Sequence, residues 1–86
     1  MYSVFVSRTF KKQFDDLQKG FQERIRKALK ELEVDPCKSR AKADIKMVHG
    51  TKPLKYRLRV GDYRIIYSVE GKNVKIIEVW HRGKVY

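Results

Sequence analysis

Hydrophobic and other side chains alternate at the start of the chain. Residues 2–7, YSVFVS, place Tyr2, Val4 and Val6 on one side of an extended backbone and leave the intervening residues on the other side. A period of two is typical of a β-strand with one face toward a core. The pattern therefore predicts that the domain begins with a strand.

The spacing of the hydrophobic residues then changes to three and four. The segment SRTFKKQFDDLQK has its apolar residues on one side of a helix, which Ser7 or Thr9 can cap at the N-terminus and Gly20 is expected to end. A second helix is predicted over residues 21–34, before Asp35-Pro36. Two adjacent helices of this kind are expected to cover a sheet. Their apolar positions are Phe10, Phe14 and Leu17, then Phe21, Ile25, Ala28, Leu29 and Leu32.

Residues 36–53 have little periodicity and much charge, so we expect a long connection with 45–49, IKMVH, as a short helical or extended insert. From Leu54 the period returns to two, in KYRLRV, YRIIYSVE and NVKIIEVW, which predicts a meander of three strands. The order is then β-α-α-β-β-β, and HRGKVY could add a short last strand. We expect an α+β fold, with the N-terminal strand and helix hairpin packed on a mostly antiparallel sheet, as one domain over residues 1–86.

Gly61-Asp62 is the expected two-residue loop of the first hairpin, because such loops favour glycine at their first position. Arg59 then lies directly opposite Arg64, with Lys55 and Arg57 on the same side and no acid beside them. Like charges opposed in a sheet are destabilising, whereas guanidinium groups bind phosphate well. The hairpin is therefore interpreted as a phosphate-binding platform. Exposed cations as edge protection, with an arginine bonded to a turn carbonyl, are the alternative.

The same alternation, continued through Gly71-Lys72, has a consequence that the cations do not explain. It puts Ile66, Ile77 and Val79 on the basic side. Either the second loop is longer than two residues, or another protein covers this apolar patch.

Composition adds a charge imbalance. The chain has 21 Lys and Arg against 10 Asp and Glu, a formal net charge of +11. Nucleic acid is the commonest polyanion that would relieve the resulting self-repulsion, and an acidic protein partner is the alternative. A single cysteine, Cys37, forms no internal disulfide, and neither a signal peptide nor a membrane-spanning run is present. We therefore expect a soluble, cytoplasmic protein.

The chain ends in EVWHRGKVY, which adds aromatic, imidazole and cationic groups to the basic strands. These are ingredients for RNA handling, since RNA carries its own nucleophile in the 2′-hydroxyl. A protein need only position that hydroxyl, move two protons and stabilise the developing charge. The sequence has no metal-ligand spacing and no glycine-rich phosphate loop, so we expect neither a metal nor a cofactor.

The block YRLRVGDYRIIYSV, the ending HRGKVY and the order of elements together resemble the RelE/ParE toxin superfamily of toxin–antitoxin systems, and within it the archaeal-type members of the RelE branch. The resemblance covers essentially the whole chain, and its specific part is the pattern YRxRxGxYRxxY … HRxxxY. It implies a ribosome-dependent, metal-independent mRNA endonuclease that cleaves the codon in the A site and so inhibits translation. It also implies a RelB-like antitoxin as partner.

Residue by residue, the resemblance assigns the catalytic positions of that family. The two strand lysines would activate the nucleophile and stabilise charge, the hairpin arginine would support the transition state, the last arginine would protonate the leaving group, and the tyrosine would stack on a base. In this chain these positions are Lys55 and Arg57, Arg64, Arg82 and Tyr86. Further RNA contacts are expected from Arg59, His81, Lys84, Lys46 and Lys52.

Arg57 departs from the family pattern, which has lysine there. Arginine stays protonated at any working pH, so Lys55 is the better candidate for the general base, and His81 is a second one because imidazole changes charge near neutrality. Two other functions stay open: a ParE-like toxin that inhibits gyrase by binding, and a degenerate RelE homologue that binds RNA without cleaving it.

Overall fold

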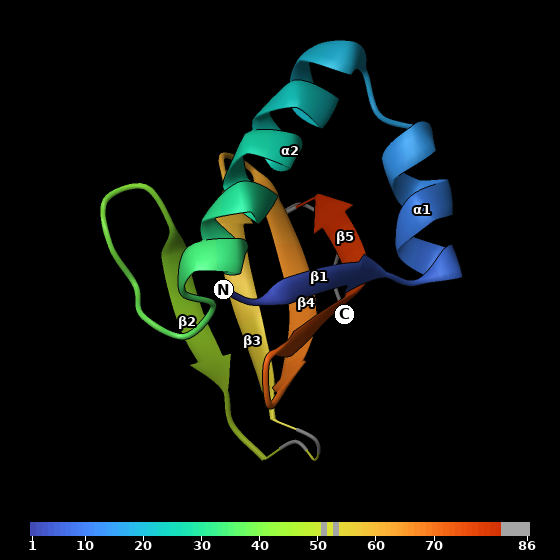
Figure 1. The fold of residues 1–86 in the computed structure, drawn as a ribbon. Helices are drawn as coiled ribbons and strands as arrows, with labels where there is room; N and C mark the ends of the chain where they lie inside the picture. The colour runs from blue at the N-terminus through green and yellow to red at the C-terminus, as the bar shows by residue number, and fades with distance from the viewer. Residues whose placement is uncertain (51, 53, 82–86) are drawn as a thin grey trace.

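Two helices and a five-stranded sheet form the domain (Figure 1). We describe them from a computed structural model, which defines residues 1–50, 52 and 54–81. None of the helices in these residues has the length and apolar composition of a membrane-spanning helix. The elements are β1 (Ser3–Val6), α1 (Arg8–Asp15), α2 (Lys19–Val34), β2 (Asp44–Val48), β3 (Lys55–Val60), β4 (Tyr63–Glu70) and β5 (Asn73–His81).

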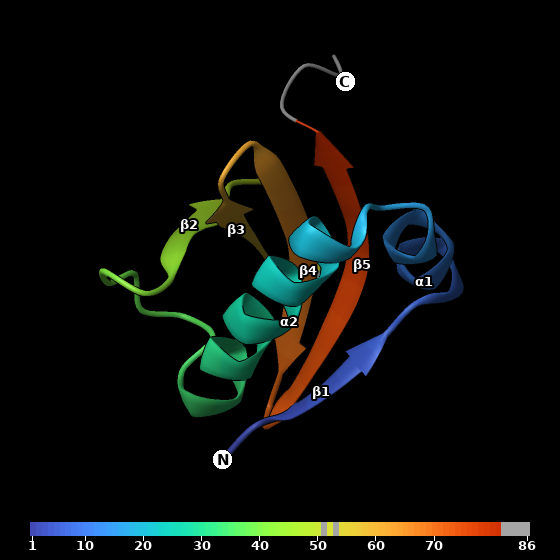
Figure 2. The same cartoon turned by 90° about the horizontal axis from the view of Figure 1, so that it is seen from above.

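The strands lie in the order β1-β5-β4-β3-β2, and every pair is antiparallel except β1 with β5. The helices connect β1 to the rest of the sheet, and α2 lies across one face of it while α1 lies beside β5 (Figure 2). The predicted α+β fold, a helix hairpin on a mostly antiparallel sheet, is confirmed.

The core forms where the helix stripes meet the inward residues of the strands. Ile25 and Leu32 of α2 are fully buried against Leu58 and Ile65 of the central strands. Tyr67 is also fully buried, and its hydroxyl donates a 2.6 Å hydrogen bond to the Pro36 carbonyl. A buried hydroxyl needs such an acceptor, because an unpaired polar group in a core is costly. This bond ties the end of α2 to the middle of the sheet.

The predicted cap of the first helix is confirmed, but its predicted end is wrong. The Ser7 hydroxyl accepts a 3.0 Å hydrogen bond from the Phe10 backbone N–H. The helix stops at Asp15, and Gly20 lies inside α2 instead of ending α1. The Gln22 side chain donates a 2.9 Å bond to the carbonyl of Phe14. Contact between the two helices therefore satisfies the end of α1, where a local pattern suggested glycine.

The connection between α2 and β3 contains a strand that the sequence left undecided between helical and extended. β2 pairs antiparallel with β3 at the edge of the sheet, with Ile45 opposite Leu58. Ile45 is buried, so the pairing of β2 with β3 removes its apolar side chain from solvent. The order is therefore β-α-α-β-β-β-β, one strand more than the predicted order.

A β-bulge takes one of three residues out of the apolar patch expected on the basic side: Ile66 and Ile77 stay there, and Val79 does not. Glu70 pairs with Asn73, so the second loop has two residues and the prediction of a longer loop is wrong. The register then shifts, because Tyr67 pairs with Ile76 whereas Ile66 pairs with Glu78, which leaves Ile77 as the extra residue. A bulge reverses the alternation beyond it. Val79 is therefore buried in the core, contrary to the expectation that it lies on the basic side.

Candidate nucleic-acid interface

The side of the sheet that points away from α2 carries most of the cations of the strands. In β3, Tyr56 and Leu58 are buried toward the helices, so the residues between them point outward. Directly paired residues on neighbouring strands share a side, which extends the same face across the sheet. We call this side the outer face; its cations are Lys46, Lys55, Arg57, Arg59, Arg64 and Lys75.

The hairpin sets two arginines directly opposite each other, as predicted. Val60 pairs with Tyr63 and Arg59 with Arg64, across a turn in which Gly61 has a φ of +59°. The Arg59 Nε donates a 3.3 Å hydrogen bond to the Gly61 carbonyl, so the alternative of an arginine bonded to a turn carbonyl holds for this one residue. Two cations directly opposed weaken a sheet. An anion bound between them would reverse that effect.

Arg57 lies in the middle of the outer face, between Lys46 of β2 and Ile66 of β4. Its side chain is half-buried, and its Nε is buried without a hydrogen-bond partner. A buried N–H of a charged group without an acceptor costs free energy, about 1–3 kcal/mol or more. A phosphate oxygen reaching this position would supply the missing acceptor. Arg57 therefore fits an anion-binding role better than a structural one.

Acidic residues share the outer face, and the prediction that no acid lies beside these cations is wrong. Asp44 at the start of β2 pairs directly with Arg59, and Glu78 of β5 pairs with Ile66. Glu70 follows on the same side at the end of β4. The cations still outnumber these acids two to one. The face thus keeps a positive excess, but one that its own acids reduce near Arg59.

Trp80 lies on the outer face, directly opposite Arg64. The bulge at Ile77 is responsible, since an unbroken alternation would have turned this indole into the core. The sequence offered this tryptophan only as one of the aromatic groups of EVWHRGKVY, and it is not among the predicted site residues. An aromatic ring beside an arginine offers a surface on which an unpaired base can stack.

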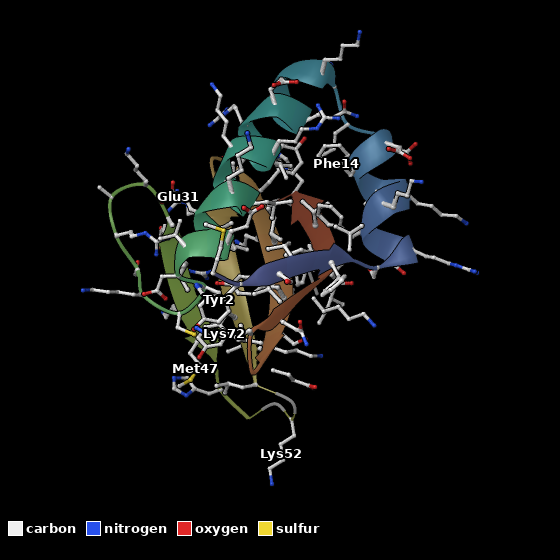
Figure 3. The ribbon with its side chains drawn as sticks, viewed as in Figure 1. Tyr2, Phe14, Glu31, Met47, Lys52 and Lys72 are labelled. Atoms are coloured by element: carbon white, nitrogen blue, oxygen red, sulfur yellow. The ribbon has the colours of Figure 1, made fainter. Side chains whose placement is uncertain are left out.

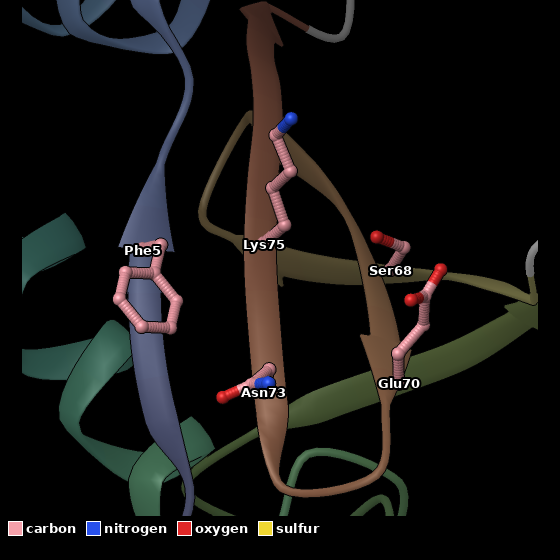
Figure 4. A pocket seen from close by; sticks show the side chains of 5 residues that line it. All are labelled: Phe5, Ser68, Glu70, Asn73 and Lys75. Carbon is pink, nitrogen blue, oxygen red and sulfur yellow. The ribbon is translucent and has the colours of Figure 1, made fainter.

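Two adjoining hollows extend the outer face toward β1. One, of about 410 Å³, reaches from Lys55 past Ser68 to the start of α1 at Thr9. The other, of about 500 Å³, continues to the exposed ring of Phe5 (Figure 4). Both are shallow and share Ser68, Glu70 and Lys75. The outer face is therefore a broad, open surface that suits an extended polymer.

Not every predicted residue joins this face. The His81 ring packs edge-on against Tyr63, with 5.2 Å between ring centroids, on the side where Tyr63 contacts Phe21 of α2. His81 thus lies on the opposite side from the arginines. Lys52 is exposed in the β2–β3 connection and points away from the sheet (Figure 3). Arg82, Lys84 and Tyr86, and the possible short last strand, lie outside the described residues.

The arrangement can hold a phosphate and stabilise negative charge on it. Guanidinium and ammonium groups on neighbouring strands are suited to an oxyanion, and their positions are fixed by the sheet. In the part of the chain that the structure describes, no three His, Cys, Asp or Glu residues are grouped so that they could hold a metal ion. The cations of the outer face can act on a phosphate through their charge and their fixed positions.

The chain is similar in sequence to known toxins of toxin–antitoxin systems. A family model described as the ParE toxin of the type II toxin–antitoxin system parDE matches residues 4–86. The chain is 31% identical over 83 residues to Toxin RelE3 of Methanocaldococcus jannaschii, covering 96% of this chain and 93% of that protein.

The chain is also similar in fold to solved structures of RelE proteins. The archaeal RelE–RelB complex of Pyrococcus horikoshii OT3 contains a chain that is 34% identical, with a TM-score of 0.82 and 98% of both chains covered. The RelB–RelE complex of Methanococcus jannaschii gives 29% identity, a TM-score of 0.74, and coverage of 91% of this chain and 89% of the other. The isolated E. coli RelE toxin gives 23% identity and a TM-score of 0.74, over 99% of this chain and 88% of that one, which shows a shared fold.

Proposed function

This chain belongs to the RelE/ParE family of toxins of type II toxin–antitoxin systems, and on that premise we propose that it is a ribosome-dependent endoribonuclease that cleaves messenger RNA in the A site. The observation that carries the proposal is the strand register. It sets Lys55, Arg57 and Arg64 on one open face, with the Nε of Arg57 lacking an acceptor. A phosphodiester is the group that this face would complete.

The proposed reaction needs no group beyond the RNA and these side chains. The 2′-oxygen attacks the adjacent phosphorus while the bond from phosphorus to the 5′-oxygen breaks, which leaves a 2′,3′-cyclic phosphate and a 5′-hydroxyl. The proton of the 2′-hydroxyl goes to a base, for which we propose Lys55, and the leaving 5′-oxygen takes up a proton, for which we propose Arg82. Arg57 and Arg64 stabilise the negative charge that develops on the oxygens bound to the attacked phosphorus.

The position of His81 supports Lys55 over His81 as the base. The imidazole packs against Tyr63 on the helix side of the sheet, whereas Lys55 lies on the outer face and lines its hollow. Tyr86 is proposed to stack on a base, and the indole of Trp80, opposite Arg64, is suited to the same task.

We further propose a RelB-like antitoxin as partner. The relatives from P. horikoshii and M. jannaschii were solved as complexes of RelE with RelB, which supports it. In this chain Phe5 and Val6 of β1, Val34 of α2 and Met47 of β2 are large apolar side chains left exposed. A partner that wraps the helices and the sheet would bury them and mask the cations. The product of an adjacent small open reading frame should therefore bind the chain and inhibit it.

A translation assay with primer extension on ribosome-bound message tests the nuclease. Wild-type protein should produce breaks in the A-site codon. The triple variant Arg64→Ala, Arg82→Ala, Tyr86→Ala should lose at least about 100-fold of the cleavage rate, the scale of one transition-state contact removed. Lys11→Ala, an exposed cation of α1, is the control and should keep the wild-type rate.

Two outcomes would contradict the proposal. Cleavage that survives the triple substitution would show that the assigned site is wrong. Inhibition of DNA supercoiling with intact message would instead support the alternative of a ParE-like toxin that inhibits gyrase by binding; the matching family model is described as a ParE toxin.

A further inference from the structure

A second group of cations surrounds a hollow at the end of β3, on the side of α2. The hollow has a volume of about 360 Å³. Ala28 and Val60 form its apolar floor, and it is distinct from the hollows beside Lys55. We call it the helix-side hollow; the charged residues that line it are Arg24, Lys27, Glu31, Lys42 and Arg59.

The charge of this hollow is not balanced from within the chain. Glu31 is its one acid, and its carboxylate is already within 3.4 Å of Arg40 Nη2. Among the described residues, Arg24, Lys27 and Lys42 have neither an acidic partner nor a hydrogen bond from their side chains. All three are exposed. An anion entering the hollow would therefore meet four cations and only one acid, which is already paired.

Two of these cations lie next to the hairpin turn. A Cβ atom at Gly61 would lie 2.7 Å from Arg24 Nη2, which places the guanidinium of Arg24 directly beside the turn. From the other side, Arg59 Nε donates to the Gly61 carbonyl at 3.3 Å. Two guanidinium groups thus meet at one turn, one from α2 and one from β3. An anion at this turn would therefore meet both guanidinium groups at once.

We propose that the helix-side hollow binds the phosphodiester backbone of RNA, as a contact separate from the site of cleavage. Arg59 is the link, because it lines this hollow and also lies opposite Arg64 on the outer face. A polyanion could therefore contact both sides of the hairpin at once. The inference deepens the proposed function by adding a contact that holds the toxin on RNA without acting on the scissile bond.

RNA is favoured over an acidic protein segment by the shape of the surface. The hollow is shallow and its floor is only Ala28 and Val60, so it has no deep apolar pocket for the side chains of a peptide. Its several cations can bind successive phosphates of a backbone, and such contacts are independent of base sequence.

Binding of a 16-base-pair RNA duplex, measured over a range of salt concentrations, tests the inference. The variant Arg24→Gln, Lys27→Gln should bind about 10-fold more weakly near physiological salt, and the slope of log affinity against log salt should fall by about 1.5–2, because two phosphate contacts are lost. The control Lys11→Gln, Lys12→Gln removes the same charge from α1 and should leave the slope nearly unchanged. Circular dichroism should show that both variants are folded.

Equal losses in both double variants would overturn the inference, since net charge alone would then explain them. Wild-type affinity in the Arg24, Lys27 variant would overturn it too, as would a loss confined to a poly-glutamate peptide. Beside the loss on the duplex, a parallel loss on message-free ribosomes would identify the backbone as ribosomal, whereas a parallel loss on a single-stranded 20-nucleotide RNA but not on ribosomes would identify it as message. Because binding is scored without cleavage, a chain that binds through this hollow but cuts no RNA would refute only the proposed function.

Discussion

The two faces of β3 and β4 differ in how completely their side chains are satisfied. Toward the helices, Leu58 and Ile65 are fully buried, and the hydroxyl of Tyr67 has its acceptor in Pro36. On the outer face, Arg57 has a buried Nε without an acceptor, and Arg64 lies opposite another arginine. Alternate residues of the same strands therefore differ: one side stabilises the fold, and the other has unsatisfied cations, which the proposed RNA site would use.

The largest expected difference is between separate substitutions of two adjacent residues on β3, one from each face. Leu58→Ala should lower the free energy of unfolding by about 2–5 kcal/mol, because it leaves a cavity in the core. Arg57→Met should leave that free energy unchanged or raise it by about 1 kcal/mol, because it removes a buried N–H without a partner, while it weakens RNA binding. Urea unfolding of both variants checks the prediction. A large loss of stability in Arg57→Met would show that the outer face is structural.

Removing one polar atom from the helix side should have an intermediate effect. Tyr67→Phe leaves the Pro36 carbonyl without its donor and should cost about 1–2 kcal/mol in urea unfolding at about pH 8. RNA binding should not change, because the ring stays in place in the core. If RNA binding falls together with stability, the two faces are not independent.

The same tyrosine predicts how stability depends on alkaline pH. Burial raises the pKa of Tyr67, and a hydrogen bond with Cys37 together with burial raises the pKa of Tyr56 to about 12. The folded state holds both protons more tightly than the unfolded chain, so this stability is complete below about pH 10 and is lost as pH rises above it. Between about pH 8 and about pH 11, Tyr67→Phe should therefore lose less stability than wild type. An equal loss would contradict the prediction.

The smallest effect is expected from an acid on the outer face. Asp44 lies opposite Arg59, so Asp44→Asn should increase RNA affinity by a few-fold and change the free energy of unfolding by less than about 0.5 kcal/mol. The increase should shrink at high salt, because exposed charges are screened. Asp15→Asn, at the end of α1, removes an acid from outside the outer face and serves as the control. Equal increases of RNA affinity in both variants would show that the outer face acts only through the net charge of the chain.

The register of the β3–β4 hairpin could be predicted from the sequence alone. A two-residue loop with glycine first predicts which residues are opposed, and the pairing of Arg59 with Arg64 is confirmed. The resemblance to the RelE/ParE superfamily, carried by the same block and the chain end, is confirmed as well. The roles of the individual residues stay predictions, and those of Arg82, Lys84 and Tyr86 concern residues outside the described part of the chain.

Three features could not be predicted, and each depends on a partner far away in the sequence. The bulge at Ile77 lies between two cross-strand pairs, Tyr67 with Ile76 and Ile66 with Glu78, and the Ser7 hydroxyl that caps α1 donates to the Ile77 carbonyl. The strand β2 exists because β3 offers it an edge. The end of α1 depends on Gln22 from the next helix. None of these leaves a periodic pattern in its own segment.

The sequence by itself determined the class of fold, the register of the basic hairpin and the family, because turn geometry, side-chain periodicity and motif spacing all act over a few residues. Only the tertiary structure decided what lies beside the cations. It placed Asp44 and Trp80 on the outer face, turned His81 away from it, and joined Arg24 of α2 to the hairpin turn. Those positions depend on which strands and helices become neighbours, and that choice belongs to the packing of the whole chain.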